Sequence, residues 1–243
     1  MEIKKVGSRG TLITFYDLGI ATNIYVIHGK KYTYMIDTYL GPDIMKPVKD
    51  LIKGAHDKTP VIIINTHSHW DHVWGNSLFS GSIIISHKKC REYMQSEGLK
   101  ELKENAKYQK GEVILTYPNL TLTDKLCFEE DHLLIWHTPG HTDDSISILD
   151  MADGVLFAGD NLERPIPYLM SKELVRYIDT LQDYLKIDAG ILIGGHTACE
   201  DKKLAEDNLD YVRRVLSGES IVMESKEFEE YHRVNLEYLN QKA

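Results

Sequence analysis

The sequence contains few cysteines, and none of them are spaced as a pair. Cys90, Cys127 and Cys199 are the 3 cysteines among 243 residues, and no Cys-x-x-Cys pattern occurs. An odd number of isolated thiols argues against a disulfide framework. We therefore expect a reducing compartment, the cytoplasm, and small buried side chains at these positions. The position of Cys199, three residues after His196, leaves its role open.

Long apolar runs are also missing. The longest purely aliphatic run, residues 61–64, is far shorter than the roughly 20 residues that cross a bilayer. Residues 1–10 lead into no apolar region of the kind that a secretory signal needs. We therefore expect a protein that neither spans nor binds a membrane.

Positive charge is scarce as well. The chain has 28 Lys and Arg residues against 37 Asp and Glu residues, so its formal net charge is -9. Nucleic-acid affinity rests largely on clustered Lys and Arg, and this balance predicts no nucleic-acid partner. We expect a small-molecule substrate, which can be anionic if a local positive centre holds it, and a monomer or homodimer.

No linker rich in Pro, Ser or Gly and no low-complexity tract divides the chain. Its hydrophobic fraction of 42% is that of an ordinary globular protein, and its length allows a sizeable core. We therefore predict a single domain over residues 1–243, with C-terminal helices at about 202–216 and 223–240 packed on it.

The hydrophobic pattern predicts an α/β fold. The predicted strands cover residues 11–18, 23–29, 31–39, 61–65, 81–87, 133–138, 145–150, 155–160 and 189–196. The apolar run at 61–65 indicates a strand that is buried on both faces, and helices are predicted over 87–108 and 172–187. Two strand-rich halves, each followed by helices, favour two sheets packed face to face with helices outside.

The stretch "THSHWDH" (residues 66–72) places four ligand-capable side chains at the end of that buried strand. Alternate side chains of an extended segment point the same way, so His67, His69 and Asp71 can converge. His72 breaks the alternation, and we expect it to begin a helix that directs it to a neighbouring point. Imidazole and carboxylate groups are ligands for zinc, iron or manganese, so the pattern indicates two adjacent metal positions.

Three further ligand candidates follow apolar strands later in the chain. They are His141 in "TPGHT", Asp160 in "AGD" and His196 in "GGH". Ligand sites in α/β sheets commonly lie where the strands end, and the glycines before His196 allow a close approach of the backbone.

These four motifs, in this order, resemble the metallo-β-lactamase superfamily of metal-dependent hydrolases, whose fold is an αββα four-layer sandwich of two mixed sheets. The resemblance covers about residues 20 to 200. It implies a first metal site and a second metal site joined by a bridging carboxylate. The implied ligands are His67, His69 and His141 for the first metal, Asp71, His72 and His196 for the second, and Asp160 for both.

The resemblance extends to the loop after residue 36. Asp37 matches an aspartate that supports the metal-binding loops in the family, whereas Tyr39 stands where a glycine is usual. The cofactors implied are two Zn²⁺ ions, with iron or manganese as alternatives. A metal-bound hydroxide would then attack the substrate, and the catalytic role falls to Asp71, whose second oxygen can orient the nucleophile or relay its proton.

Several branches of the superfamily share this ligand set. Zinc β-lactamases generally lack the bridging aspartate or the second-site histidine, and tRNA-processing members carry an added RNA-binding arm that is missing here. Flavodiiron proteins have a glutamate where this chain has His69. The ligand set is closest to those of glyoxalase II and the acyl-homoserine lactonases. We therefore predict hydrolysis of a small ester, thioester or lactone, with a phosphodiesterase or a mononuclear-iron persulfide dioxygenase as alternatives.

Three residues are candidates for substrate contacts. Trp74 follows the metal-binding motif and is expected either to pack in the core or to line the substrate pocket. Arg164 and Tyr168 lie in a proline-containing loop after Asp160, and such loops often carry specificity. The lactonases have a catalytic tyrosine shortly after the bridging aspartate, whereas Tyr168 comes eight positions later.

Overall fold

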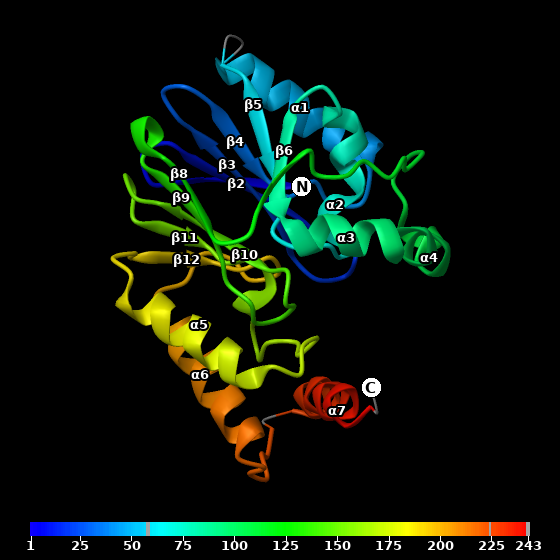
Figure 1. The fold of residues 1–243 in the computed structure, drawn as a ribbon, viewed down its shortest axis with the longest axis vertical. Coiled ribbons are helices and arrows are strands. Elements are labelled where there is room, and N and C mark those ends of the chain that lie inside the picture. Colours follow the sequence, from blue (N-terminus) through cyan, green and yellow to red (C-terminus); the bar gives the residue numbers. More distant parts are fainter. Residues whose placement is uncertain (57–58, 224, 242–243) are drawn as a thin grey trace.

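The computed structural model describes residues 1–56, 59–223 and 225–241. Two β-sheets form the centre of the fold and helices cover both outer faces, so the molecule has four layers (Figure 1). The predicted α/β sandwich of two mixed sheets is therefore confirmed.

The first sheet has seven strands in sequential order. They are β1 (Glu2–Val6), β2 (Gly10–Phe15), β3 (Thr22–His28), β4 (Thr33–Ile36), β5 (Val61–Ile64), β6 (Ile83–His87) and β7 (Leu120–Leu122). Strands β1 to β4 are antiparallel, while β4, β5, β6 and β7 run parallel to one another. A parallel connection needs a crossover, which helix α1 (Pro42–His56) provides between β4 and β5.

The second sheet has five strands in the order β12-β11-β10-β9-β8. They are β8 (Lys125–Phe128), β9 (Leu133–His137), β10 (Ile146–Asp150), β11 (Val155–Phe157) and β12 (Ile191–Ile193). All neighbours are antiparallel except β11 and β12, which are parallel and are joined through helix α5 (Leu174–Lys186). The ends of β9, β11 and β12 therefore lie at the same edge of this sheet.

The main core lies between the two sheets, and strand alternation decides which residues enter it. Ile62 and Ile64 of β5 pack in this core, whereas Ile63 between them packs on the opposite face with Met45 and Val48 of α1. All three isoleucines are at most 2% exposed. The strand is thus buried on both faces, as its continuous apolar run predicts.

The outer face of the second sheet is covered by α5 and by α6 (Lys203–Leu216). In α5, Leu174, Tyr177, Leu181 and Tyr184 are buried, and their spacing of three and four residues places them on one face of the helix. Helix α7 (Lys226–Asn240) follows, and its buried Asn235 donates to the Pro167 carbonyl and accepts from the Leu169 amide.

The predicted helix over residues 87–108 is divided in the structure. It forms α3 (Lys88–Ser96), α4 (Gly98–Glu104) and a 3₁₀ turn (Ala106–Tyr108). The break falls beside Gly98, a poor helix former. A Cβ atom added at Gly98 would lie 3.1 Å from a methyl carbon of Leu115, so the glycine also allows the chain to pass close to Leu115.

Four elements have no counterpart in the sequence-based prediction: α1, β1, β7 and β8. Helix α1 contains Pro47 in its interior, and proline normally argues against a helix. Strands β1 and β7 lie at the two edges of the first sheet and are mostly exposed, so they lack a clear apolar alternation. Among the described residues, no helix is both long and apolar enough to cross a membrane.

Candidate metal centre

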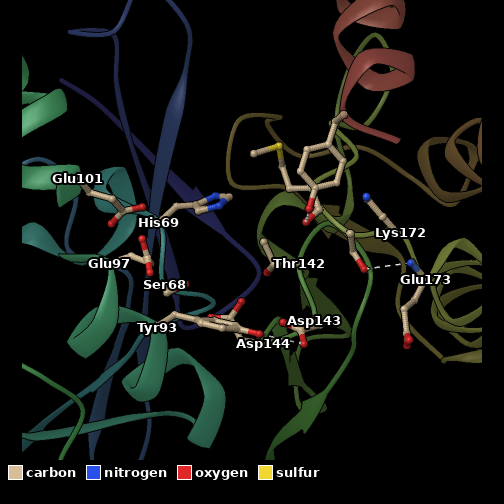
Figure 2. A pocket seen from close by; sticks show the side chains of 13 residues that line it. Ser68, His69, Tyr93, Glu97, Glu101, Thr142, Asp143, Asp144, Lys172 and Glu173 are labelled. Atoms are coloured by element: carbon tan, nitrogen blue, oxygen red, sulfur yellow. Dashed lines mark hydrogen bonds between the residues drawn. The ribbon is translucent and has the colours of Figure 1, made fainter. Parts of the chain in front are cut away.

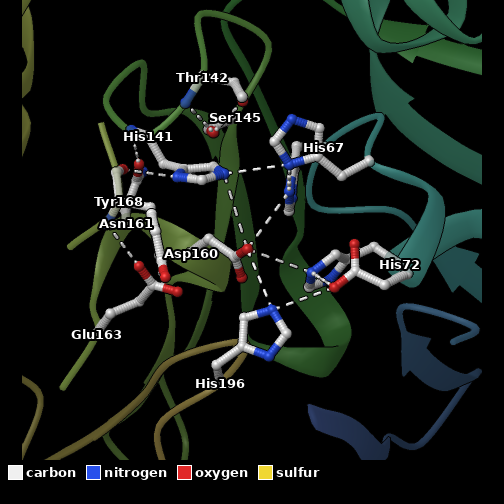
Figure 3. A network of polar contacts seen from close by, with 12 residues as sticks. His67, His72, His141, Thr142, Ser145, Asp160, Asn161, Glu163, Tyr168 and His196 are labelled. Carbon is white, nitrogen blue, oxygen red and sulfur yellow. Dashed lines mark hydrogen bonds and ion pairs between the residues drawn. The ribbon is translucent and has the colours of Figure 1, made fainter. Parts of the chain in front are cut away.

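Four segments, each following a strand, bring the predicted ligands together at one edge of the two sheets. His67 and His69 follow β5, and the short helix α2 (Trp70–Val73) begins directly after them. His141 follows β9, while Asp160 and His196 follow β11 and β12. Because these strand ends meet at one edge of the sandwich, side chains 129 positions apart in the sequence, from 67 to 196, face one another (Figure 3).

The first group of ligand atoms comes from three histidines and one aspartate. The Nδ1 atom of His69 lies 3.0 Å from His67 Nε2 and 3.2 Å from His141 Nε2. Asp160 Oδ2 lies 3.6 Å from His67 Nε2 and 3.8 Å from His141 Nε2. Three ring nitrogens and a carboxylate oxygen thus surround a single point, and together they can hold one metal ion.

The second group lies on the other side of Asp160. Asp71 Oδ2 is 3.5 Å from His72 Nε2 and 3.2 Å from His196 Nε2. Asp160 Oδ2 is 3.3 Å from His72 Nε2 and 3.4 Å from His196 Nε2. One oxygen of Asp160 therefore faces both groups, which is the position of a bridging ligand.

Asp37 and Thr66 orient two of the histidine rings. Asp37 Oδ2 accepts a hydrogen bond from His72 Nδ1 at 2.8 Å, and the two Asp37 oxygens also accept from the Thr66 amide and hydroxyl. Since the Thr66 hydroxyl donates to Asp37, it accepts from His67 Nδ1, 3.0 Å away. In their neutral form both rings therefore carry the proton on Nδ1 and leave Nε2 free to bind a metal, as ligating imidazoles require.

Backbone carbonyls hold two further rings in the same way. His141 Nδ1 donates to the Tyr168 carbonyl at 2.8 Å, and His196 Nδ1 donates to the Ala21 carbonyl at 2.9 Å. A carbonyl oxygen can only accept, so the neutral form of each ring carries its proton on Nδ1 and leaves Nε2 free to bind a metal. Among the clustered histidines, His69 alone presents Nδ1 to the site.

The close approach of the backbone at Gly195 depends on its lack of a side chain. A Cβ atom there would lie 2.0 Å from Asp160 Oδ1 and 2.9 Å from the Cε1 atom of His72. Any larger residue would therefore displace the carboxylate that faces both groups. This confirms the expectation that the glycines before His196 permit close contact.

Burial and mutual repulsion keep the first group of histidines neutral. Burial lowers the pKa of His69 and of His67, in the latter case well below the usual value with help from the nearby His72. Burial also lowers the pKa of His141 to about 4. A metal binds the neutral imidazole, so these three side chains are ready to ligate near neutral pH.

Carboxylates change the balance in the second group. Burial by itself lowers the pKa of His72 and His196, but Asp160 and Asp71 outweigh it and raise both values well above the usual range. For the acid Asp71, burial acts in the opposite direction and raises the pKa. The positive charges of His72 and His196 outweigh this effect and bring the pKa of Asp71 to about 2. Without a cation, this group would hold extra protons, and a metal ion would replace them.

Two buried polar atoms of the cluster without hydrogen-bond partners indicate whether it suits a metal ion. His72 Nε2 and Asp160 Oδ1 are fully buried and have no hydrogen-bond partner among the described residues. Leaving such atoms unsatisfied costs free energy, and a cation held by His72 Nε2 and the Asp160 carboxylate would compensate for it. The residues present therefore fit a metal centre.

A third carboxylate lies beside the second group and was not predicted from the sequence. Glu163, only 4% exposed, can offer an oxygen within 4.8 Å of ligand atoms of Asp160 and His196. Its Oε2 accepts the Tyr168 amide at 2.7 Å, and burial together with the Asp160 charge raises its pKa to about 8. Its spacing of three after Asp160 matches no motif, so the sequence alone offered no signal.

Trp74 lies in the core rather than at a substrate surface. Its side chain is 1% exposed and packs with Val73, Cys90 and Met94. The expectation that Trp74 contacts substrate is therefore wrong, because the ring, at the start of the 3₁₀ turn after α2, is buried in this core cluster.

Arg164 and Tyr168 have other partners. Arg164 forms ion pairs of 2.7 Å with Glu200 and with Asp207, so its guanidinium is engaged on the surface. Tyr168 contacts the cluster through its carbonyl, and its ring lies edge-on to Tyr231 of α7. Their direct contact with a substrate stays a prediction.

Tyr39 shows how the loop after β4 tolerates a residue other than glycine. Its φ of 54° lies in the left-handed region, as does the φ of 65° at Asp37, and this region favours glycine. The Tyr39 ring is fully buried and stacks on Phe15 with centroids 4.7 Å apart. Burial of the ring offsets the cost of the backbone conformation.

Comparison with known proteins agrees with this geometry. Residues 18–196 match the family model of the metallo-beta-lactamase superfamily, a range that contains every residue of the cluster. The chain belongs to this superfamily. Membership, together with the cluster of histidines and aspartates, makes the chain a metal-dependent hydrolase.

Two mammalian proteins and a solved metallo-beta-lactamase structure are among the similar proteins. The chain is 24% identical to the acyl-coenzyme A thioesterase MBLAC2 of Bos taurus over 205 residues, which are 73% of this chain and 72% of that protein. It is also 24% identical to MBLAC2 of Homo sapiens over 204 residues, with the same coverage. The crystal structure of DIM-1 metallo-beta-lactamase shares the fold, with a TM-score of 0.70, 18% identity and coverage of 88% of this chain and 97% of that one.

Proposed function

We propose that this superfamily member is a dinuclear zinc hydrolase that cleaves a small thioester, ester or lactone. The observation that carries the proposal is the position of Asp160 Oδ2, within 3.8 Å of ring nitrogens from both ligand groups. A carboxylate oxygen shared in this way suits two adjacent divalent cations. Iron or manganese could take the same nitrogen and oxygen ligands.

The ligand roles follow from the two groups. The first metal would be held by His67, His69 and His141, and the second by Asp71, His72 and His196, with Asp160 between them. Asp37, Thr66 and the carbonyls of Ala21 and Tyr168 would keep four of the rings in the ligating tautomer.

Two bound zinc ions would supply hydroxide from water at neutral pH and polarise the carbonyl oxygen that is attacked. The protein side chains then have to orient the reacting groups. Asp71 is the candidate catalytic residue, since its side chain is 13% exposed and its Oδ2 is engaged with His72 and His196. Its Oδ1 would accept a hydrogen bond from the attacking water and hold that water in line with the substrate carbonyl.

The preference for a thioester or related acyl substrate draws on the relatives. Both MBLAC2 proteins are named acyl-coenzyme A thioesterases, and this chain aligns with 72% of each. The second ligand group, made of Asp71, His72 and His196, is complete, in agreement with the resemblance of the ligand set to glyoxalase II and the lactonases.

The direct test combines metal analysis with a substrate panel. The protein, purified without added metal, is analysed for zinc, iron and manganese, and is then assayed with thioesters, lactones, phosphodiesters and β-lactams. We expect two zinc ions per chain and cleavage of thioesters or lactones. One iron per chain with oxygen uptake in the presence of glutathione persulfide would contradict the proposal, as would cleavage of phosphodiesters alone.

A pair of aspartate variants tests the bridging role. Asp160→Ala removes the shared oxygen, so it should lower the metal content and reduce kcat/KM at least about 1000-fold. Asp183→Asn is the matched control, because Asp183 is 64% exposed on α5 and should leave both quantities unchanged. Normal metal content and turnover in Asp160→Ala would refute the bridge.

A further inference from the structure

A cavity of about 460 Å³ lies beside the metal centre, with Ser68 and His69 in its wall (Figure 2). Helices α3 and α4 form one side through Tyr93 and Glu101, and the segment after β9 forms another through Asp144. His69 belongs to the first ligand group, so a molecule bound in this cavity would reach the metal centre directly.

The charged side chains around this cavity are mainly acidic. They are Glu97, Glu101, Asp143, Asp144, Glu173 and, as the single cation, Lys172. The Lys172 ammonium donates to the Gln241 carbonyl, while Asp143 pairs with Lys89 at 2.6 Å. Glu101 and Asp144, in contrast, form no ion pair with any residue that the structure describes.

Asp144 is an independent sign that the cavity takes a ligand. Its side chain is 0% exposed, and neither carboxylate oxygen has a hydrogen bond of normal geometry with a described residue. The hydroxyls of Thr142 and Ser68 are close enough to lower its pKa, but burial outweighs them and raises it. A buried carboxylate without such bonds is costly, and the positive charge of a ligand in the cavity would offset part of that cost by Coulomb attraction.

Glu101 lines the same cavity as Asp144 and likewise has no cationic partner among the described residues. Burial and the nearby charges of Asp71, Asp144 and Glu97 raise its pKa to about 7. A cation between Glu101 and Asp144 would favour the ionised form of both groups.

Aromatic and thioether side chains complete the wall. Tyr93, Tyr238 and Met170 line the cavity together with the carboxylates. Aromatic rings beside carboxylates are suited to an organic ammonium group, which gains both Coulomb and cation–π attraction.

We infer that this cavity binds a positively charged organic group, such as an ammonium, on the part of the substrate that is not cleaved. The inference rests on the proposed function, because it places the scissile bond at the metal centre next to His69. It also separates this chain from an enzyme that would seat the anionic phosphates of coenzyme A in this cavity, since like charges would repel them.

The test compares three thioesters with the zinc-loaded protein. Acetylthiocholine carries a quaternary ammonium, 3,3-dimethylbutyl thioacetate is its neutral counterpart of the same shape, and acetyl-coenzyme A is anionic. We expect kcat/KM for acetylthiocholine to exceed that for the neutral thioester about tenfold or more, with acetyl-coenzyme A the poorest. Equal cleavage of the charged and neutral thioesters, or a preference for acetyl-coenzyme A, would overturn the inference and leave the proposed hydrolase standing.

Two variants test whether the preference for the charged thioester arises from this cavity. Glu101→Gln and Asp144→Asn remove one negative charge each with little change in shape, and each should reduce the ratio of the two kcat/KM values at least threefold. Glu206→Gln on the exposed face of α6 is the matched control and should leave the ratio unchanged. An unchanged ratio in both cavity variants that retain the wild-type melting temperature would overturn the assignment of this cavity.

A binding measurement tests the cavity separately, so that the inference can be judged even if none of these three thioesters is cleaved. Calorimetry with choline and with 3,3-dimethylbutanol tests the cavity without turnover. We expect choline to bind the zinc-loaded protein at least about tenfold more tightly, and Glu101→Gln to reduce this difference. Equal or undetectable binding of the two compounds would overturn the inference.

Discussion

Asp37 Oδ2 lies 2.8 Å from Nδ1 of His72, although the two residues are 35 positions apart in the sequence. Burial raises the pKa of Asp37, and the hydrogen bonds from His72 and Thr66 offset only part of that rise. The hydrogen bond from His72 joins the loop after β4 to helix α2. The other carboxylate oxygen of Asp37, Oδ1, accepts a hydrogen bond from the Thr66 amide. Asp37 thus links the metal-binding loop to the segment that follows strand β4 of the first sheet.

We therefore expect Asp37→Asn to weaken zinc binding about 10–100-fold, because loss of the carboxylate removes the orienting charge behind a ligating histidine. Competition with a zinc chelator of known affinity measures this change. Asp50→Asn, on the exposed face of α1, is the control. Wild-type zinc affinity in Asp37→Asn would show that the position of His72 depends on other contacts.

Asp131 is expected to contribute to stability by joining the two sheets. Its carboxylate accepts hydrogen bonds from the Lys30 amide at 2.6 Å, the Tyr32 amide at 3.2 Å and the Tyr34 hydroxyl at 2.8 Å. Asp131→Asn should therefore lower the free energy of unfolding by about 1–3 kcal/mol at pH 7. Urea denaturation measures the loss, and Asp124→Asn at an exposed position is the control.

The same carboxylate predicts a pH dependence. Burial tends to raise the pKa of Asp131, but the hydrogen bonds from Tyr34, Lys31 and Lys30 outweigh it and lower that pKa. A lowered folded-state pKa stabilises the fold above the unfolded value of about 3.9, and this contribution is lost as the pH falls through the folded-state pKa. The difference in stability between the native protein and Asp131→Asn should therefore shrink below about pH 4. A difference that stays constant from pH 7 to pH 3 would contradict this linkage.

Trp74→Phe distinguishes a core residue from a substrate contact. The smaller ring leaves a void beside Cys90 and Met94, so the free energy of unfolding should fall by about 1–3 kcal/mol. KM should stay the same, since the side chain is 1% exposed. Leu99→Ala, at a side chain that is 72% exposed, should change neither quantity. A raised KM in a Trp74→Phe protein of normal stability would restore the substrate role.

Tyr168→Phe tests whether the side chain or the backbone of this residue matters. The contact with His141 uses the Tyr168 carbonyl, which the substitution retains. Zinc content and kcat should therefore remain within about twofold of the native values. A loss of kcat by tenfold or more with normal zinc content would instead assign the hydroxyl a direct part in the reaction, as in the lactonases.

Much of the fold and of the metal centre follows from local sequence. The position of each ligand at a strand end predicts that His67, His69, His141, Asp160 and His196 converge, and the structure brings them together. Strand alternation is wrong for Asp71, because helix α2 already begins at Trp70 and places Asp71 in the second group with His72. The prediction fails where local preference is misleading. Pro47 conceals helix α1, and the continuous polar pattern over residues 87–108 hides the break at Gly98.

The sequence by itself determined the ligand types, their order and the two-sheet core, because these depend on residue chemistry and on short-range periodicity. Only the tertiary structure decided which atoms face one another across the sandwich. Packing under α2 buries Trp74, and the loop after β11 turns Glu163 towards the second ligand group. The acidic cavity beside His69 likewise arises where α3, α4 and the segment after β9 meet, and no local pattern encodes such a meeting of distant segments.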